Sequence, residues 1–147
     1  MNRAIPAVAL AALLAACSAA PQSPQGATGS DRTAGAATPP VEAVDWRLAD
    51  AGAVARLPSL RLDPVSRRAS GSGGCNRLAG PYMLDGARLR IGPLASTRMA
   101  CLDPAASALE ARFLAALDAT ASYRIGGGFL TLLDAAGRPL LKLEPAG

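Results

Sequence analysis

The chain has 147 residues, with 15 basic and 11 acidic side chains, three cysteines and no histidine. The missing histidine excludes Ser-His-Asp and Cys-His catalytic pairs, histidine general bases and metal sites that need an imidazole ligand. The length fits one domain, alone or with a tail, and alanine supplies much of the 50% hydrophobic content. The larger apolar side chains therefore suffice for one small core.

The first 16 residues follow the order of a bacterial export signal. A positive start ends at Arg3, an apolar run covers Ile5–Leu14, and small residues precede Cys17. As a helix, this run would measure about 15 Å, half of the roughly 30 Å hydrocarbon core, so we do not expect a membrane span. Residues 14–17 (Leu-Ala-Ala-Cys) resemble the lipobox of bacterial lipoproteins, in which the peptide is cut before the cysteine and the cysteine is acylated. We expect a signal peptide at residues 1–16 and palmitate-type lipid on Cys17. The alternative is an ordinary signal peptide with a cysteine near its cut by chance.

Residues 17–40 should then form a lipid-anchored tether. Ser18 follows Cys17 in place of aspartate, which by the sorting rule of enteric lipoproteins points to the outer membrane, facing the periplasm. Ser18–Pro40 contains no large apolar side chain, so it cannot offset its chain entropy and we expect it to be disordered. Its 23 residues give a reach of roughly 25–30 Å. A peptide that binds the cell wall or a partner is the alternative.

The arginines are scattered along the chain and form no block with interleaved aromatic residues. We therefore expect no nucleic-acid partner. The positive net charge is compatible with a weak, non-specific attraction to anionic lipid or glycolipid.

Residues 41–147 should form the folded domain, because apolar and polar residues there alternate with period two in short segments. Asp85-Gly86 and Gly126–Gly128 predict tight hairpin turns. The connections are too short for crossovers, which favours antiparallel pairing. The predicted strands are residues 45–48, 59–62, 67–70, 78–84, 87–91, 122–125, 129–133 and 140–144.

One segment, Pro104–Ala119, has helical spacing instead. Asp103 is placed to cap its first amides, and Pro104 suits the first helical position. Four apolar residues share one face of this helix: Leu109, Phe113, Leu114 and Leu117. We expect an α+β fold, in which a curved, mostly antiparallel sheet of about eight short strands (half-barrel-like) packs its open face against this one helix.

Two charged or glycine-rich features are interpreted as structural. Gly71–Gly74 is followed by no Gly-Lys-Ser/Thr and no helix, so a turn or bulge is favoured over a phosphate loop. Arg67 and Arg68 are interpreted as solvated charges at a strand edge.

Acid–base catalysis by carboxylates is disfavoured because turns or caps use most of the aspartates: Asp45, Asp63, Asp85, Asp103 and Asp134.

Cys75 and Cys101 are the thiols that remain once Cys17 is acylated. In an oxidising compartment two cysteines in one small domain most often pair, and closing this loop should stabilise the fold by about 3–4 kcal/mol. A redox-active pair is less favoured, because there is no Cys-x-x-Cys spacing and no histidine to lower a thiol pKa. Two free buried thiols are the third possibility.

Three segments together resemble the META-domain family, which includes HslJ-like heat-shock proteins. These are Ser70–Arg77 with its Gly-Cys-Asn-Arg, Gly80–Gly86, and Thr97–Cys101 with its Thr-Arg-Met-Ala-Cys. The resemblance continues through Leu109-Glu110 and the segments 114–117, 122–125 and 130–133. It implies a curved antiparallel sheet with a helix, no catalytic residues, and an association with the envelope and with stress, including heat shock.

The chain departs from the family pattern at two positions. Leu78 stands where the family usually has an aromatic residue, which removes packing area. Pro81 deletes a ladder donor in a strand, so we expect that strand to be an edge or to carry a bulge.

The leading hypothesis is an outer-membrane-anchored, non-enzymatic binding or accessory module, without cofactor or metal. It would bind an envelope protein or a lipid through the concave sheet surface. The candidate binding residues are Asn76, Arg77, Thr97 and Arg98. Their structural interpretation is that Asn76 satisfies a turn and Arg98 bridges carbonyls. Two other functions are considered: a thiol-disulfide enzyme that uses Cys75 and Cys101, and a holdase-like stress protein that shields misfolded envelope clients through an exposed apolar patch.

Overall fold

The computed structural model describes residues 40–147, which contain nine strands and one helix. The expected signal peptide, Cys17 and nearly all of the tether lie outside the described residues. No helix among residues 40–147 has the length and apolar character needed to cross a membrane. The elements are β1 Asp45–Leu48, β2 Ser59–Asp63, β3 Arg68–Ser72, β4 Arg77–Asp85, β5 Arg88–Ile91, β6 Ala95–Ser96, α1 Pro104–Asp118, β7 Ser122–Gly126, β8 Phe129–Leu133 and β9 Pro139–Pro145.

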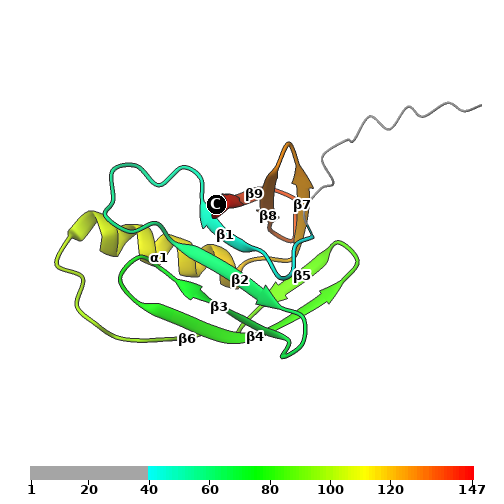
Figure 1. Ribbon diagram of the computed structural model, residues 1–147, viewed down its shortest axis with the longest axis horizontal. Helices are drawn as coiled ribbons and strands as arrows, with labels where there is room; N and C mark the ends of the chain where they lie inside the picture. The colour runs from blue at the N-terminus through cyan, green and yellow to red at the C-terminus, as the bar shows by residue number, and fades with distance from the viewer. Residues whose placement is uncertain (1–39) are drawn as a thin grey trace, which may run out of the picture. The chain divides into compact units, whose positions relative to one another are not determined.

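The strands form one antiparallel sheet that curves into a ring (Figure 1). Their order is β3-β2-β1-β9-β8-β7-β5-β4-β6, and an additional pairing of β3 with β4 closes the ring. The predicted α+β class, curved antiparallel sheet and packed helix are confirmed. The sheet closes further than the expected half-barrel, because β4 pairs with β3 over five residues and with β5 over four.

Alternation along the strands places the core inside the ring. In β5, Leu89 and Ile91 are buried while Arg88 and Arg90 are exposed, as period two requires. The helix adds fully buried Phe113 to the same cluster. The buried core side chains, from sheet and helix, are Val41, Trp46, Leu60, Leu62, Ala69, Leu78, Tyr82, Leu89, Ile91, Phe113, Leu117, Leu130, Leu132 and Leu143. The concave surface expected to bind a partner is therefore filled by the protein's own core, and that location for a binding site is wrong.

The helix α1 begins as predicted. Asp103 has extended backbone angles, and its Oδ1 accepts the N–H of Ala105 at 2.8 Å. Pro104 occupies the first turn, where its missing N–H costs nothing. Helix α1 contacts β5 and β9, and the buried face of the helix carries Leu109, Phe113 and Leu117.

Two hairpins show how glycine sets the turns. The β7–β8 loop is Gly127-Gly128, with φ of 59° and 81°, and both angles are accessible to glycine without strain. The β4–β5 loop is Gly86-Ala87, because Asp85 pairs with Arg88. This loop lies one residue later than the predicted Asp85-Gly86 pair, and only Gly86 in it has positive φ, at 56°.

Pro81 lies inside β4, and the expectation that this strand is an edge is wrong. β4 pairs with β3 on one side and with β5 and β6 on the other. The carbonyl of Pro81 accepts the N–H of Gly92 at 2.8 Å, and the nitrogen and carbonyl of one strand residue point to the same side. The side of Pro81 that lacks an N–H therefore faces the gap between the end of β5 and the start of β6. The strand pairing beside β4 is already interrupted at this gap.

Candidate functional site at the disulfide end

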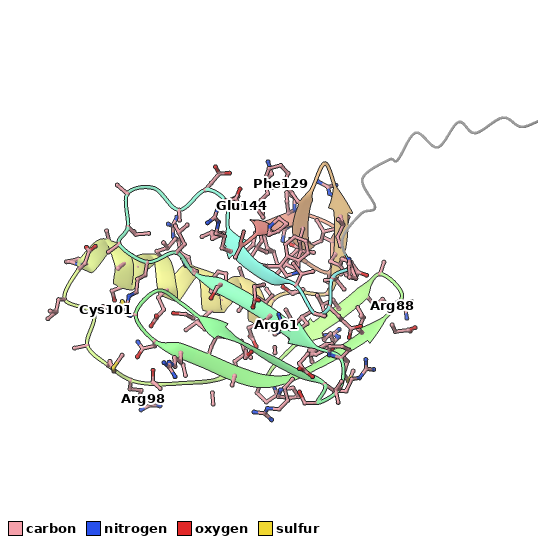
Figure 2. All side chains as sticks on the ribbon, in the orientation of Figure 1. Arg61, Arg88, Arg98, Cys101, Phe129 and Glu144 are labelled. Carbon is pink, nitrogen blue, oxygen red and sulfur yellow. A yellow bond between two sulfur atoms is a disulfide. The ribbon has the colours of Figure 1, made fainter. Side chains whose placement is uncertain are left out.

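The two cysteines of the domain meet where two loops approach the start of α1. Cys75 lies in the β3–β4 connection, Cys101 lies just before the helix, and their Sγ atoms are bonded, with the Cα atoms 5.7 Å apart. In Figure 2, Cys101 and Arg98 lie at the end of the domain opposite Arg88, which begins β5. The connection therefore holds two loops together at one end of the ring.

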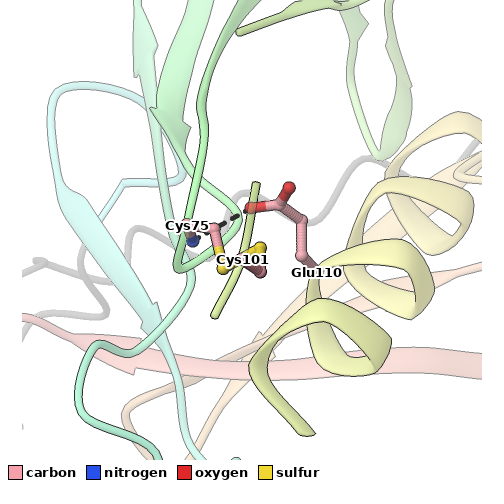
Figure 3. A group of neighbouring side chains, drawn as sticks. All are labelled: Cys75, Cys101 and Glu110. Carbon is pink, nitrogen blue, oxygen red and sulfur yellow. Dashed lines mark hydrogen bonds between the residues drawn. A yellow bond between two sulfur atoms is a disulfide. The ribbon is translucent and has the colours of Figure 1, made fainter. Parts of the chain in front are cut away.

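Glu110 on α1 reaches across to the same loop (Figure 3). Its Oε2 accepts the main-chain N–H of Cys75 at 3.0 Å and that of Asn76 at 2.7 Å, and its Oε1 accepts the side-chain amide of Asn76 at 2.6 Å. Burial acts to raise the pKa of this carboxyl, but the hydrogen bonds from Asn76 and Cys75 outweigh it, so the pKa lies below its usual 4.5. The carboxylate is a fixed, ionised anchor for the loop.

Asn76 extends this network to the second loop. It is 6% exposed, and its Oδ1 accepts the N–H of Met99 at 2.7 Å and the hydroxyl of Thr97 at 2.9 Å. The Thr97 hydroxyl also accepts the N–H of Arg77 at 3.1 Å. The side chains of Asn76 and Thr97 therefore form hydrogen bonds within the domain.

Arg77 and Arg98 are exposed and take no part in this network through their side chains. Neither is in an ion pair with another residue of 40–147. The structural interpretation of Arg98 was that it bridges carbonyls. No carbonyl in that range accepts a hydrogen bond from the Arg98 guanidinium. The structure separates the four candidate residues into two anchors and two available cations.

A groove runs beside the disulfide on the outside of the ring. It has a volume of about 600 Å³, and Arg56, Leu57, Arg77 and Met99 are among its lining residues. An adjoining hollow of about 400 Å³ shares Arg56, Cys75 and Met99 with it and is also lined by Leu102 and Asp103.

Three large apolar side chains are exposed here. Leu57 is 37% exposed, Met99 62% and Leu102 98%. Sequence reasoning missed them, although one signal was present: Leu102 precedes the helix cap, where an apolar residue normally packs on the fourth helical residue, and that residue is Ser107. Leu102 therefore has no apolar partner in its own helix.

One sulfur from each cysteine and a carboxylate oxygen of Glu110 lie within 4.8 Å of one another. Such a set resembles a small metal site, but the two sulfurs are bonded to each other and the carboxylate already accepts three N–H groups. Thiolates and a free carboxylate are what a cation needs. In this arrangement the three residues form a structural link.

The model of the META domain family matches residues 39–147. This match spans the entire ring, the helix and the disulfide. The chain belongs to the META domain family. The segments on which the sequence resemblance rested, around Cys75-Asn76 and Thr97–Cys101, are the two loops that Glu110 and the disulfide hold together in this META domain.

Two solved structures resemble this META domain. One is described as the NMR structure of a protein from Burkholderia xenovorans; it is 29% identical, with a TM-score of 0.56, and the match covers 72% of this chain and 83% of that one. A second NMR structure is 23% identical, with a TM-score of 0.54 and coverage of 71% and 90%, and it shows the fold alone. A comparison with curated proteins finds no match.

Proposed function

We propose that the chain is an exported lipoprotein whose META domain is a non-enzymatic binding module of the cell envelope. Its binding surface is the disulfide-end surface, which we define as Arg56, Leu57, Arg77, Arg98, Met99 and Leu102. The observation that carries the proposal is the near-complete exposure of Leu102, at 98%, beside Met99 at 62%, on loops that are otherwise firmly held.

Exposed apolar side chains gathered in one place, with polar residues around them, are typical of interaction sites. Here the loops that carry them are fixed from three directions. The disulfide joins Cys75 to Cys101, Asn76 accepts the N–H of Met99, and Glu110 holds the Cys75-Asn76 main chain. A surface held in this way loses little conformational entropy when a partner binds, which favours a binding role.

The anchoring half of the proposal rests on the sequence of residues 1–40. The lipobox-like residues 14–17 and Ser18 support acylation of Cys17 and transport to the outer membrane, with the domain facing the periplasm. Labelled palmitate should be incorporated by the exported chain and not by the Cys17→Ser variant. Equal labelling of the two chains would contradict anchoring through Cys17.

The binding half is tested by photo-crosslinking in the intact envelope. A photo-reactive amino acid placed at position 102 should give a discrete adduct, and one placed at Val65 should not. Val65 is a matched control because it is also apolar and 92% exposed but lies in the turn between β2 and β3. Arg77→Ala should weaken the adduct at position 102. The same adducts from both positions, or none from position 102, would contradict a binding role for the disulfide-end surface.

A further inference from the structure

We infer that the disulfide-end surface docks on a bilayer that contains anionic phospholipid, with Leu102 and Met99 entering the acyl region and the arginines binding phosphate groups. This inference rests on the proposed function and names the partner of the same surface. Three features of this surface support it: the projection of the apolar residues, the charge around them, and the rigidity of the loops.

The apolar residues project outward. Leu102 is 98% exposed and comes immediately before the helix cap Asp103, and Met99 is 62% exposed three residues earlier. A protein partner would need a pocket complementary to such projecting side chains, whereas fluid acyl chains conform to them. Burial of these side chains at the boundary between head groups and acyl chains is favourable in proportion to the apolar area removed from water.

The charge around the apolar residues is positive. Arg56 and Arg77 line the groove, and Arg98 adjoins Met99. None of the three forms an ion pair with a residue of 40–147. The same is true of Arg68, Arg88, Arg90, Arg112 and Arg124, so these three are distinguished by their place beside exposed apolar side chains.

The acidic groups Asp103 and Glu110 accept hydrogen bonds from N–H groups and not from these arginines. Asp103 caps the helix through Ala105, and Glu110 is 8% exposed and accepts three hydrogen bonds. These N–H donors are neutral, so both carboxylates keep their negative charge, and the three arginines exceed them by one positive charge. Guanidinium groups that no carboxylate binds therefore lie beside apolar side chains, and guanidinium binds phosphate in a bidentate manner. Adjacent basic and apolar groups match the phosphate and acyl layers of an anionic leaflet.

The loops keep this arrangement before any membrane is met. Met99 donates its N–H to Asn76 at 2.7 Å, and the disulfide fixes Cys101 between Met99 and Leu102. The inserting residues are thus presented together. The tether expected from the sequence, with a reach of roughly 25–30 Å, would keep the domain near the bilayer that holds its lipid.

The test uses tryptophan as a depth reporter in the full chain, reconstituted in vesicles whose acyl chains carry bromine as a quencher. Leu102→Trp is compared with Val65→Trp, which places the same reporter at an equally exposed position in the β2–β3 turn. Trp46 is fully buried in both variants and supplies a constant background. Vesicles of phosphatidylcholine alone are compared with an equal mixture of phosphatidylcholine and phosphatidylglycerol.

The expected result is several-fold stronger quenching of Leu102→Trp in the mixed vesicles than in phosphatidylcholine alone, with no quenching of Val65→Trp in either. Arg77→Ala together with Arg98→Ala should reduce the quenching at position 102, and Arg88→Ala together with Arg90→Ala should not. Salt should reduce it as well, because the screening length falls from about 10 Å at 0.1 M to about 3 Å at 1 M.

Absence of quenching at position 102, or equal quenching at positions 102 and 65, would overturn the inference. Equal quenching at position 102 in both lipid compositions would overturn the phosphate contacts. If position 102 is unquenched but the crosslinker there still captures a discrete protein, the lipid inference fails while the proposed binding module stands. If both experiments fail, both proposals fail.

Discussion

Glu110 accepts both the main-chain N–H and the side-chain amide of Asn76, at 2.7 and 2.6 Å. Glu110 lies on α1 and Asn76 lies just before β4, so this pair joins the helix to the loop that carries Cys75. The disulfide then joins that loop to the segment of Met99 and Leu102. The exposed surface at this end therefore depends on a buried acid whose hydrogen bonds all go to Cys75 and Asn76.

Replacing Glu110 by glutamine should weaken the fold in a pH-dependent way. Loss of hydrogen bonds to a charged acceptor should lower the free energy of unfolding by about 1–3 kcal/mol at neutral pH. Because the folded pKa lies below the usual 4.5, the carboxylate's contribution is complete above that pH and is lost as the pH falls through the lower, folded value. Urea unfolding of both chains across this range should show the difference shrinking in acid. A difference that stays constant with pH would show that the charge is unimportant.

Asn76 and Thr97 should behave as a coupled pair in stability. Asn76→Ala removes the acceptor of the Thr97 hydroxyl and of the Met99 N–H, and Thr97→Val removes the hydroxyl. In a double-mutant cycle measured by urea unfolding, the coupling should be about 0.5–3 kcal/mol. Strictly additive losses would contradict the shared network.

Gly73→Ala should destabilise the domain because of one specific contact. A Cβ at this position would lie 2.4 Å from Cγ of Glu110 and 2.6 Å from its Oε2, and three hydrogen bonds hold that side chain in place. We expect a loss of about 1–3 kcal/mol. Gly126→Ala is the matched control, since a Cβ there meets nothing within 4 Å and needs no positive φ. Thermal unfolding of the two variants should separate them, and equal melting temperatures would be inconsistent with the crowding at Glu110.

Replacing Cys75 and Cys101 together by alanine should lower the free energy of unfolding by about 3–4 kcal/mol, the loop-closure value for a separation of 26 residues. Adding a reductant to the wild-type chain should produce a similar loss, and the double variant should not respond to it. Reductant-insensitive unfolding of the wild-type chain would indicate that the two thiols are not joined in solution.

Tyr82→Phe should loosen the segment around Glu42, which precedes β1. The Tyr82 hydroxyl donates to Glu42, and burial, followed by this hydrogen bond, raises the pKa of Tyr82 to about 12. The raised pKa means that the contribution of the neutral phenol is present below pH 10 and is lost as the pH rises toward 12. Alkaline titration followed by tyrosinate absorbance should show a transition near pH 12 that the variant lacks. Stability at neutral pH should fall by about 1 kcal/mol.

The strands and the helix were predictable because each buries one face. Leu89 and Ile91 alternate with arginines, and Leu109, Phe113 and Leu117 recur at helical spacing. Strand β6 was missed because Ala95-Ser96 is too short to show a period. The closure of the ring was missed because it depends on how strongly the sheet curves, which brings β3 and β4 together. The alternation of apolar and polar residues predicts strands but not the curvature of the sheet.

The site was predictable only in part. Cys75 and Cys101 were identified from their type and expected compartment, and Asn76 and Thr97 from the segments that contain them. Glu110 was not identified as a site residue, because an acid on a helix is usually solvated and its three donors come from a loop far away in sequence. The exposure of Leu102 had one local signal, the polar Ser107 at the fourth helical position, but its place beside Met99 depends on how the loops approach the helix.

The pairing of β3 with β4 removes the open edge that β3 would otherwise have, whereas β5 and β7 pair only at Arg88 and Ser122. β3 is hydrogen-bonded on both sides, and the strand at the end of the sheet order is β6, with two residues. Long unpaired edges are the usual templates for strand exchange and fibrillar aggregation between neighbouring copies. The paired edge of β3 therefore offers no template to a second copy of the chain, even where copies are concentrated, as they would be under the proposed lipid anchoring.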